Sequence, residues 1–205
     1  MFRGLFGFLT RKPKEEMKPD KIVVGLGNPG NQYKGTRHNA GFMALAELAR
    51  RHSAGRSQKR FQGETFEVVI GGTSVLLLCP LTFMNLSGSS VTAALSFYKL
   101  PPERLLVVCD DVDLPVGKIR VRNSGGSGGQ KGLKDILQKT GTEMLARVRV
   151  GIGRPPERMD TADYVLSAFR PEERAEVESA VKRAADAAEC WIERGTDEAM
   201  NRFNG

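Results

Sequence analysis

Hydrophobic positions along the chain follow two spacings, one typical of buried strands and the other of amphipathic helices. Short apolar runs bounded by turn residues predict strands, and apolar positions three or four residues apart predict helices. The predicted strands cover residues 22–26, 66–70, 75–79, 105–109, 119–122 and 148–152. The predicted helices cover residues 40–51, 86–98, 133–138 and 172–193, followed by a short terminal helix that Thr196 is expected to cap. This mixture predicts an α/β fold, a single domain with a central mixed, twisted β-sheet sandwiched between helices.

The length of 205 residues suits one domain. We expect residues 1–20 to form a flexible, basic N-terminal extension and residues 21–205 to form the folded domain. No apolar run reaches the ~18 residues that a membrane span needs, so no membrane contact is expected. The three cysteines form no Cys-x-x-Cys motif and no Cys/His cluster, which disfavours metal sites and disulfides. Free thiols suit a reducing compartment, and we expect a cytoplasmic protein.

The charge balance favours a polyanionic partner. The chain has 31 Lys and Arg residues against 24 Asp and Glu residues, which gives a net charge of +7. A positive field of this kind attracts nucleic acids. The alternative is a basic protein that its charge merely keeps soluble, and composition alone leaves both interpretations open.

Two glycine-rich segments match known motifs formally, but their contexts disfavour the usual functions. Residues 25–30 match the dinucleotide-binding pattern G-x-G-x-x-G. However, Pro29 and Gly30 predict a turn instead of a helix start, and no acidic residue ends a second strand, so a nicotinamide site is disfavoured. Residues 125–129 match the G-x-S-x-G nucleophile elbow, but both histidines precede Ser127, which disfavours a serine triad. We expect instead a mobile glycine loop that can approach a ligand closely.

Polar side chains come directly after two of the predicted strands. Asn28 follows the first strand, and Asp110, Asp111 and Asp113 follow the strand at 105–109. Ligands of open α/β sheets gather at the carboxyl ends of the strands. The three acidic residues therefore either bind Mg²⁺ at this edge or form a solvated turn.

His38 and Asn85 each have two interpretations. His38 lies just before a predicted helix, and a lone histidine is more often structural than catalytic unless a carboxylate fixes its tautomer. Asn85 either caps the next helix or points into the same cleft as Asn28. In the second case Phe83 and Met84 supply the apolar wall of a ligand pocket.

Taken in order, these segments resemble the bacterial-type peptidyl-tRNA hydrolase family over residues 21–205. The matching strings are GLGNPG from residue 25, TRHNAG from 36, TFMNLSG from 82, DDVDLP from 110 and SGGQKGLKD from 127. No single string is specific for the family, but the occurrence of several of them in the right order is. The resemblance implies an esterase that cleaves the bond between a peptide's carbonyl group and the 3′ ribose of tRNA, and so recycles tRNA from stalled or aborted translation.

The resemblance also implies roles for individual residues. His38 would be the general base that activates water, with Asp110 hydrogen-bonded to its other ring nitrogen. Asn28 and Asn85 would hold the amide and carbonyl groups of the peptide. The residues expected to contact the acceptor end and 3′ CCA of peptidyl-tRNA are Tyr33, Phe83, Met84, Asn85, Lys131, Arg122 and Arg149, with the two arginines clamping the 5′ phosphate.

Lys131 departs from the family pattern, in which many members carry an asparagine. A lysine cannot accept a hydrogen bond, so the position loses a water-orienting amide and gains a group that can pair with a phosphate. We expect no metal and no cofactor, and a monomer. The alternative function is a non-catalytic RNA-binding or splicing-associated protein on the same scaffold.

Overall fold

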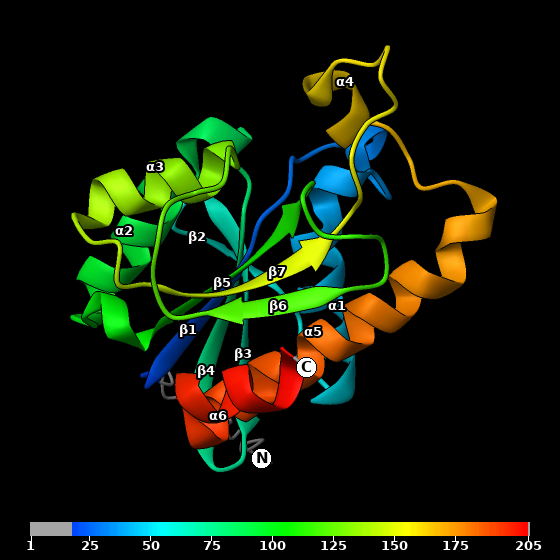
Figure 1. The fold of residues 1–205 in the computed structure, drawn as a ribbon. Coiled ribbons are helices and arrows are strands. Elements are labelled where there is room, and N and C mark those ends of the chain that lie inside the picture. Colours follow the sequence, from blue (N-terminus) through cyan, green and yellow to red (C-terminus); the bar gives the residue numbers. More distant parts are fainter. Residues whose placement is uncertain (1–17, 205) are drawn as a thin grey trace, which may run out of the picture.

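The computed structural model describes residues 18–204, which form one sheet with helices on both faces (Figure 1). The strands are β1 (Lys21–Gly25), β2 (Gln58–Arg60), β3 (Gly63–Ile70), β4 (Thr73–Pro80), β5 (Leu105–Asp111), β6 (Ile119–Arg122) and β7 (Ala146–Gly151). The helices are α1 (Ala40–Arg51), α2 (Ser87–Tyr98), α3 (Lys131–Thr140), α4 (Thr161–Val165), α5 (Arg174–Arg194) and α6 (Thr196–Phe203). The predicted α/β architecture is confirmed. The predicted extension, residues 1–20, lies outside the described residues except for its last three.

Seven strands form one mixed sheet in the order β2-β3-β4-β1-β5-β7-β6. The four central strands, β4, β1, β5 and β7, are parallel, and β2, β3 and β6 are antiparallel to their neighbours. Parallel strands end at the same edge of a sheet, where open α/β folds bind their ligands. The topology therefore brings together Asn28 after β1, the segment 83–85 after β4, and Asp110 at the end of β5.

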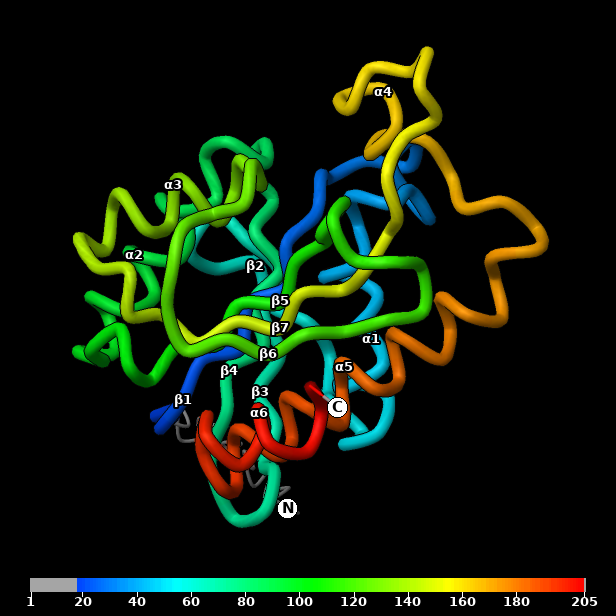
Figure 2. The backbone as a smooth tube through the Cα atoms, viewed as in Figure 1, coloured from blue at the N-terminus to red at the C-terminus, as the bar shows by residue number. Residues whose placement is uncertain are grey.

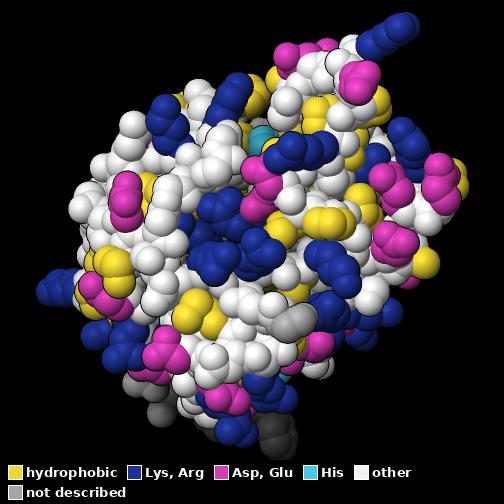
Figure 3. All heavy atoms as spheres, viewed as in Figure 1, with side chains coloured by type: hydrophobic (Ala, Val, Ile, Leu, Met, Phe, Trp, Pro, Cys, Tyr) yellow, Lys and Arg dark blue, Asp and Glu magenta, His cyan; other side chains and the backbone are white. Residues whose placement is uncertain are grey.

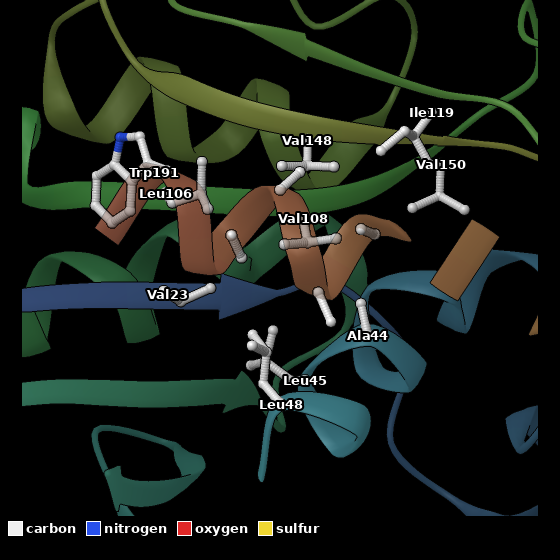
Figure 4. Close-up of a cluster of buried hydrophobic side chains, with 14 of the residues drawn as sticks. Val23, Ala44, Leu45, Leu48, Leu106, Val108, Ile119, Val148, Val150 and Trp191 are labelled. Carbon is white, nitrogen blue, oxygen red and sulfur yellow. The ribbon is translucent and has the colours of Figure 1, made fainter. Parts of the chain in front are cut away.

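Each face of the sheet buries its own apolar cluster, because successive strand residues point to opposite faces. Val23 and Leu106 pack on one face against α1 and α5, and Figure 4 shows Trp191 of α5 beside them. Val24 and Val107 pack on the other face with residues of α2 and α3. Burial on both faces explains why the central strands are continuous hydrophobic runs in the sequence.

The predicted strands and helices are present, with bounds shifted by a few residues. The hairpin between β3 and β4 turns at Gly71 and Gly72, whose φ angles are 55° and 81°. The sequence pattern missed β2 and α4, which have only three and five residues. The prediction that Thr196 caps the terminal helix is wrong, because Gly195 occupies the cap position and the Thr196 hydroxyl accepts a hydrogen bond from Trp191 Nε1 (3.1 Å).

The start of α1 lies so close to the sheet that no side chain fits at the contact. A Cβ atom on Gly41 would lie 2.3 Å from the backbone nitrogen of Leu26 and 2.4 Å from the carbonyl oxygen of Val108. A Cβ atom on Gly25 would lie 2.4 Å from the carbonyl oxygen of Gly41. The first glycine of the GLGNPG segment therefore serves helix packing. The same close approach places His38, in the turn before α1, beside the end of β5.

We predict that Gly41→Ala lowers the free energy of unfolding by about 3 kcal/mol, because the atoms in its way belong to the backbone and cannot rotate aside. Gly55→Ala is the matched control, since no atom lies within 4 Å of its Cβ position. Urea unfolding of the two variants measures the difference. Equal stability of the two variants would contradict the packing argument.

Candidate active site

A pocket of about 520 Å³ opens at the carboxyl edge of the sheet, between the start of α3 and α4. Figure 3 shows a histidine side chain in a hollow at this edge and a group of Lys and Arg side chains over β6 and β7. The predicted site residues that line the pocket are Asn28, His38, Phe83, Met84, Asn85, Asp110 and Lys131. Tyr33, Arg122 and Arg149 are not part of its lining.

His38 and Asp110 meet at the bottom of this pocket, 72 residues apart in the chain. His38 Nδ1 lies 2.8 Å from Asp110 Oδ2, and both residues are buried. An ionised carboxylate only accepts hydrogen bonds, so this contact places the ring hydrogen on Nδ1 and leaves Nε2 as a proton acceptor. The arrangement fixes the tautomer that general-base chemistry requires.

The other oxygen of Asp110 is held by Gln130, a residue that the sequence analysis missed. Gln130 Nε2 donates to Asp110 Oδ1 (3.1 Å), and Gln130 Oε1 accepts from the backbone N–H of Leu133 in the first turn of α3 (2.7 Å). The only sequence signal is a polar residue directly before a helix, which by itself indicates a cap.

Asn28 is fixed by two neighbouring segments. Its backbone N–H donates to Asn39 Oδ1 (2.9 Å), and Asn39 Nδ2 donates back to the Asn28 carbonyl (3.1 Å). The side-chain oxygen of Asn28 accepts from the backbone N–H of Met84 (3.1 Å). Because that contact uses the oxygen, the Nδ2 group of Asn28 is the part left to face a ligand in the pocket.

The segment after β4 supplies an apolar wall and a second amide. Met84 is buried, Phe83 is 63% exposed, and Asn85 is exposed at the pocket. Asn85 does not cap α2, because Leu86 occupies the cap position, which leaves the alternative in which it shares a cleft with Asn28. Lys131 is exposed at the pocket, in the first position of α3.

Four arginines occupy one face of the sheet where β6 and β7 pair. Arg120 lies opposite Arg149 and Arg122 opposite Arg147, so the four side chains share this face. We call these four residues the arginine face. Like charges directly opposite one another in a ladder are destabilising, and such a cluster attracts polyanions.

The glycine-rich segment lies over the arginine face. Arg147 is fully buried and donates to the carbonyl groups of Gly125, Glu143 and Leu145. Burial lowers the pKa of Arg147, and the neighbouring Arg149 lowers it further. Arg149 donates to the Gly126 carbonyl (2.8 Å), whereas Arg120 and Arg122 are exposed.

The three acidic residues at the end of β5 and just after it are paired separately. Asp110 binds His38, Asp111 accepts from Arg149 (2.9 Å), and Asp113 accepts from Arg154 (2.7 Å). Across residues 18–204, no group of three or more His, Cys, Asp or Glu side chains is arranged to hold a metal ion.

Arg37 anchors the turn that carries His38. It is 2% exposed, its guanidinium donates to Glu173 Oε2 (2.7 Å), and it stacks on the rings of Tyr164 and Phe169. Tyr164 belongs to α4, and three other residues of this helix line the pocket, Thr161, Ala162 and Val165. Figure 2 shows this part of the chain beside the turn before α1. No local pattern identifies Arg37, because the partners of its side chain follow it by more than 110 residues.

Fold and site together define the class, an α/β protein with a histidine–carboxylate pocket beside a basic sheet face. The peptidyl-tRNA hydrolase family model matches residues 22–205. Peptidyl-tRNA hydrolases from Rhodopirellula baltica and Syntrophomonas wolfei are 50% and 46% identical over 184 residues, which is 90% of this chain and 97% and 100% of theirs. The crystal structure of peptidyl-tRNA hydrolase from Acinetobacter baumannii matches with a TM-score of 0.84 and 35% identity, covering 94% of this chain and 98% of that one. The chain therefore belongs to the peptidyl-tRNA hydrolase family, which confirms the resemblance.

Within the described residues, no helix is both long and apolar enough to cross a bilayer. The cytoplasmic location and the monomeric state stay predictions.

We predict that Glu173→Gln lowers the free energy of unfolding by about 2 kcal/mol at neutral pH. Burial by itself raises the pKa of Glu173, but hydrogen bonds from Arg37 and from the backbone N–H of Arg170 outweigh it and lower the pKa. A lowered pKa stabilises the fold above the unfolded-state value, and this contribution is lost as the pH falls through the folded-state value. The stability difference between the two proteins should therefore shrink on acidification.

Urea unfolding at a series of pH values measures this difference. Glu172→Gln, at an exposed neighbouring position, is the control and should cost little at any pH. A difference for Glu173→Gln that stays constant with pH would show that the ion pair with Arg37 does not stabilise the fold.

Proposed function

We propose that this protein hydrolyses the ester bond of peptidyl-tRNA, releasing the peptide and a reusable tRNA. Membership of the peptidyl-tRNA hydrolase family supports the substrate. The observation that carries the chemistry is the contact between His38 and Asp110 at the bottom of a pocket that two asparagine side chains also line.

In this proposal His38 is the general base. Its Nε2 takes a proton from water, and the water oxygen attacks the carbonyl carbon of the ester. The tetrahedral intermediate collapses, the bond to the 3′ oxygen of the ribose breaks, and the imidazolium returns its proton to that oxygen. Asp110 keeps the ring in the productive tautomer and stabilises the charged ring, and a base of this kind contributes roughly 10²–10⁴-fold.

Asn28 and Asn85 hold the peptide in this proposal. Asn28 Nδ2 is suited to donate to a carbonyl oxygen, and donors aimed at a developing oxyanion contribute roughly 10²-fold or more. An aminoacyl-tRNA lacks the first peptide bond, so side chains arranged to bind that bond are left unpaired. Selection for N-blocked substrates follows from this. Phe83 and Met84 contribute apolar contact area.

The tRNA is held by its phosphates on the arginine face. Arg122 is exposed there, and Arg149, opposite Arg120, forms an ion pair with Asp111. Arginine suits this task because its guanidinium binds phosphate oxygens in pairs. In this proposal Lys131, on the rim of the pocket, pairs with a phosphate near the 3′ end, and Tyr33 and Phe83 contact the terminal bases. A non-catalytic RNA-binding role would need the arginine face but not the contact between His38 and Asp110, and no observation favours it.

We expect His38→Ala to lower kcat for an N-acetylated aminoacyl-tRNA by roughly 10²–10⁴-fold. Its affinity for tRNA should be unchanged, since the phosphates bind elsewhere. The matched control is His52→Ala, because His52 is the second histidine of the chain and contacts Glu189 on α5 (2.9 Å). Rates and filter binding, both measured without added metal, decide the outcome. Near-normal cleavage by His38→Ala would exclude it as the base.

We expect Arg122→Ala to weaken tRNA binding and to flatten its salt dependence by roughly one unit of log–log slope, as the loss of one phosphate contact requires. Arg194→Ala is the control, because Arg194 is exposed at the end of α5, the helix on the other face of the sheet. Dissociation constants at several salt concentrations give both slopes. Identical slopes for Arg122→Ala and the unchanged protein would remove Arg122 from the phosphate site.

A further inference from the structure

Within residues 18–204, Gln130 is the one side chain that hydrogen-bonds both Asp110 and the backbone of α3. It is 7% exposed and occupies the cap position of the helix. Its Oε1 accepts from the backbone N–H of Leu133 (2.7 Å). A backbone N–H can only donate, so this contact fixes which end of the amide is oxygen and directs Nε2 toward the pocket.

Both hydrogens of the Gln130 amide already have acceptors. Nε2 donates to Asp110 Oδ1 (3.1 Å) and to the sulfur of Met84 (3.2 Å). Gln130 therefore has no N–H left to bind a substrate, although it lines the pocket. Its chemistry is directed at Asp110.

The carboxylate of Asp110 is held from two sides. Oδ2 faces His38 Nδ1 and Oδ1 faces Gln130 Nε2, while the residue is only 3% exposed. Rotation of the carboxylate out of the plane of the imidazole would break one or both hydrogen bonds. With Gln130 removed, Oδ1 would be left buried without this donor, which is costly for an ionised group.

We propose that Gln130 is a positioning residue for hydrolysis, acting through Asp110 to keep the carboxylate aligned with His38. This inference rests on the proposed function and adds a third member to its catalytic pair. It also makes the geometry of the His38–Asp110 pair depend on the position of the first turn of α3, because the Gln130 amide hydrogen-bonds both Asp110 and that turn.

The deciding variant is Gln130→Glu. Glutamate keeps an oxygen for the N–H of Leu133 but places its second oxygen against Asp110 Oδ1. Two carboxylates at this distance share a proton, and once that proton is lost they repel each other. Gln130→Met removes all three hydrogen bonds of the side-chain amide, to Asp110, Met84 and Leu133, at similar volume. Gln138→Glu is the control, with the same chemical change at an exposed position of the same helix.

We expect Gln130→Met to lower kcat about tenfold, as the loss of a hydrogen bond to a charged group implies, with KM and tRNA affinity unchanged. For Gln130→Glu, the ratio of its kcat to that of the unchanged protein should fall as pH rises, because the proton that bridges the two carboxylates is lost. The other charged groups near this pair are His38, Lys131 and the ion pair of Asp111 with Arg149, and all are the same in both proteins. Gln138→Glu should show neither effect.

A second readout does not depend on activity. The chain has two histidines, so ¹⁵N–¹H spectra of the imidazoles contain one signal to follow and one reference. Both Gln130 variants should shift the ring signals of His38 and leave those of His52 in place.

Unchanged His38 signals together with an unchanged kcat in both Gln130 variants would overturn the proposal. So would a loss of kcat that is independent of pH in Gln130→Glu, with unmoved His38 signals and a lowered unfolding temperature, since a purely structural cap behaves in that way. If the unchanged protein does not cleave N-acetylated aminoacyl-tRNA, the proposed function fails. The imidazole spectra then still decide whether Gln130 positions the pair.

Discussion

The structure depends on one constraint: parallel strands that are neighbours in a sheet must end at the same edge. β4, β1 and β5 are such neighbours, and each carries a different functional group past its end. The contact between His38 and Asp110 is possible only because α1 starts directly against β1 and β5, without a side chain between them. Sheet order, helix packing and the histidine–carboxylate contact are therefore parts of a single arrangement.

The second organising feature is the cluster of positive charge on the arginine face, where the four arginines repel one another. Arginines face each other across β6 and β7, where like charges oppose pairing. The fold tolerates this by giving Arg147 backbone carbonyl groups as acceptors and by giving Arg149 a carboxylate. Arg120 and Arg122 are exposed, so their positive charge is available to attract a ligand. A polyanion bound to this face would reduce the repulsion between the arginines that is present in the free protein. The same positive charge that destabilises the pairing of β6 and β7 would therefore favour binding of the polyanion.

Most of the fold could be predicted from the sequence, because hydrophobic spacing and turn residues are local signals. The strands with two buried faces and the long amphipathic helix gave the strongest patterns. β2 and α4 were missed because neither is long enough to complete a pattern. The cap assigned to Thr196 was wrong because Gly195 competes for that position.

The site was predictable only in part. The pocket does contain Asn28, His38, Asn85 and Asp110, whose order in the chain identified the family. Gln130 and Arg37 were not predicted because their roles depend on partners far away in the sequence, and residue spacing does not reveal such contacts.

At Gly25 and Gly41 the backbones of β1 and α1 are already in contact, and both positions hold the smallest amino acid. A larger residue at one position cannot be compensated by a smaller one at the other, because both are already glycine. Evolution and design must therefore keep both glycines together.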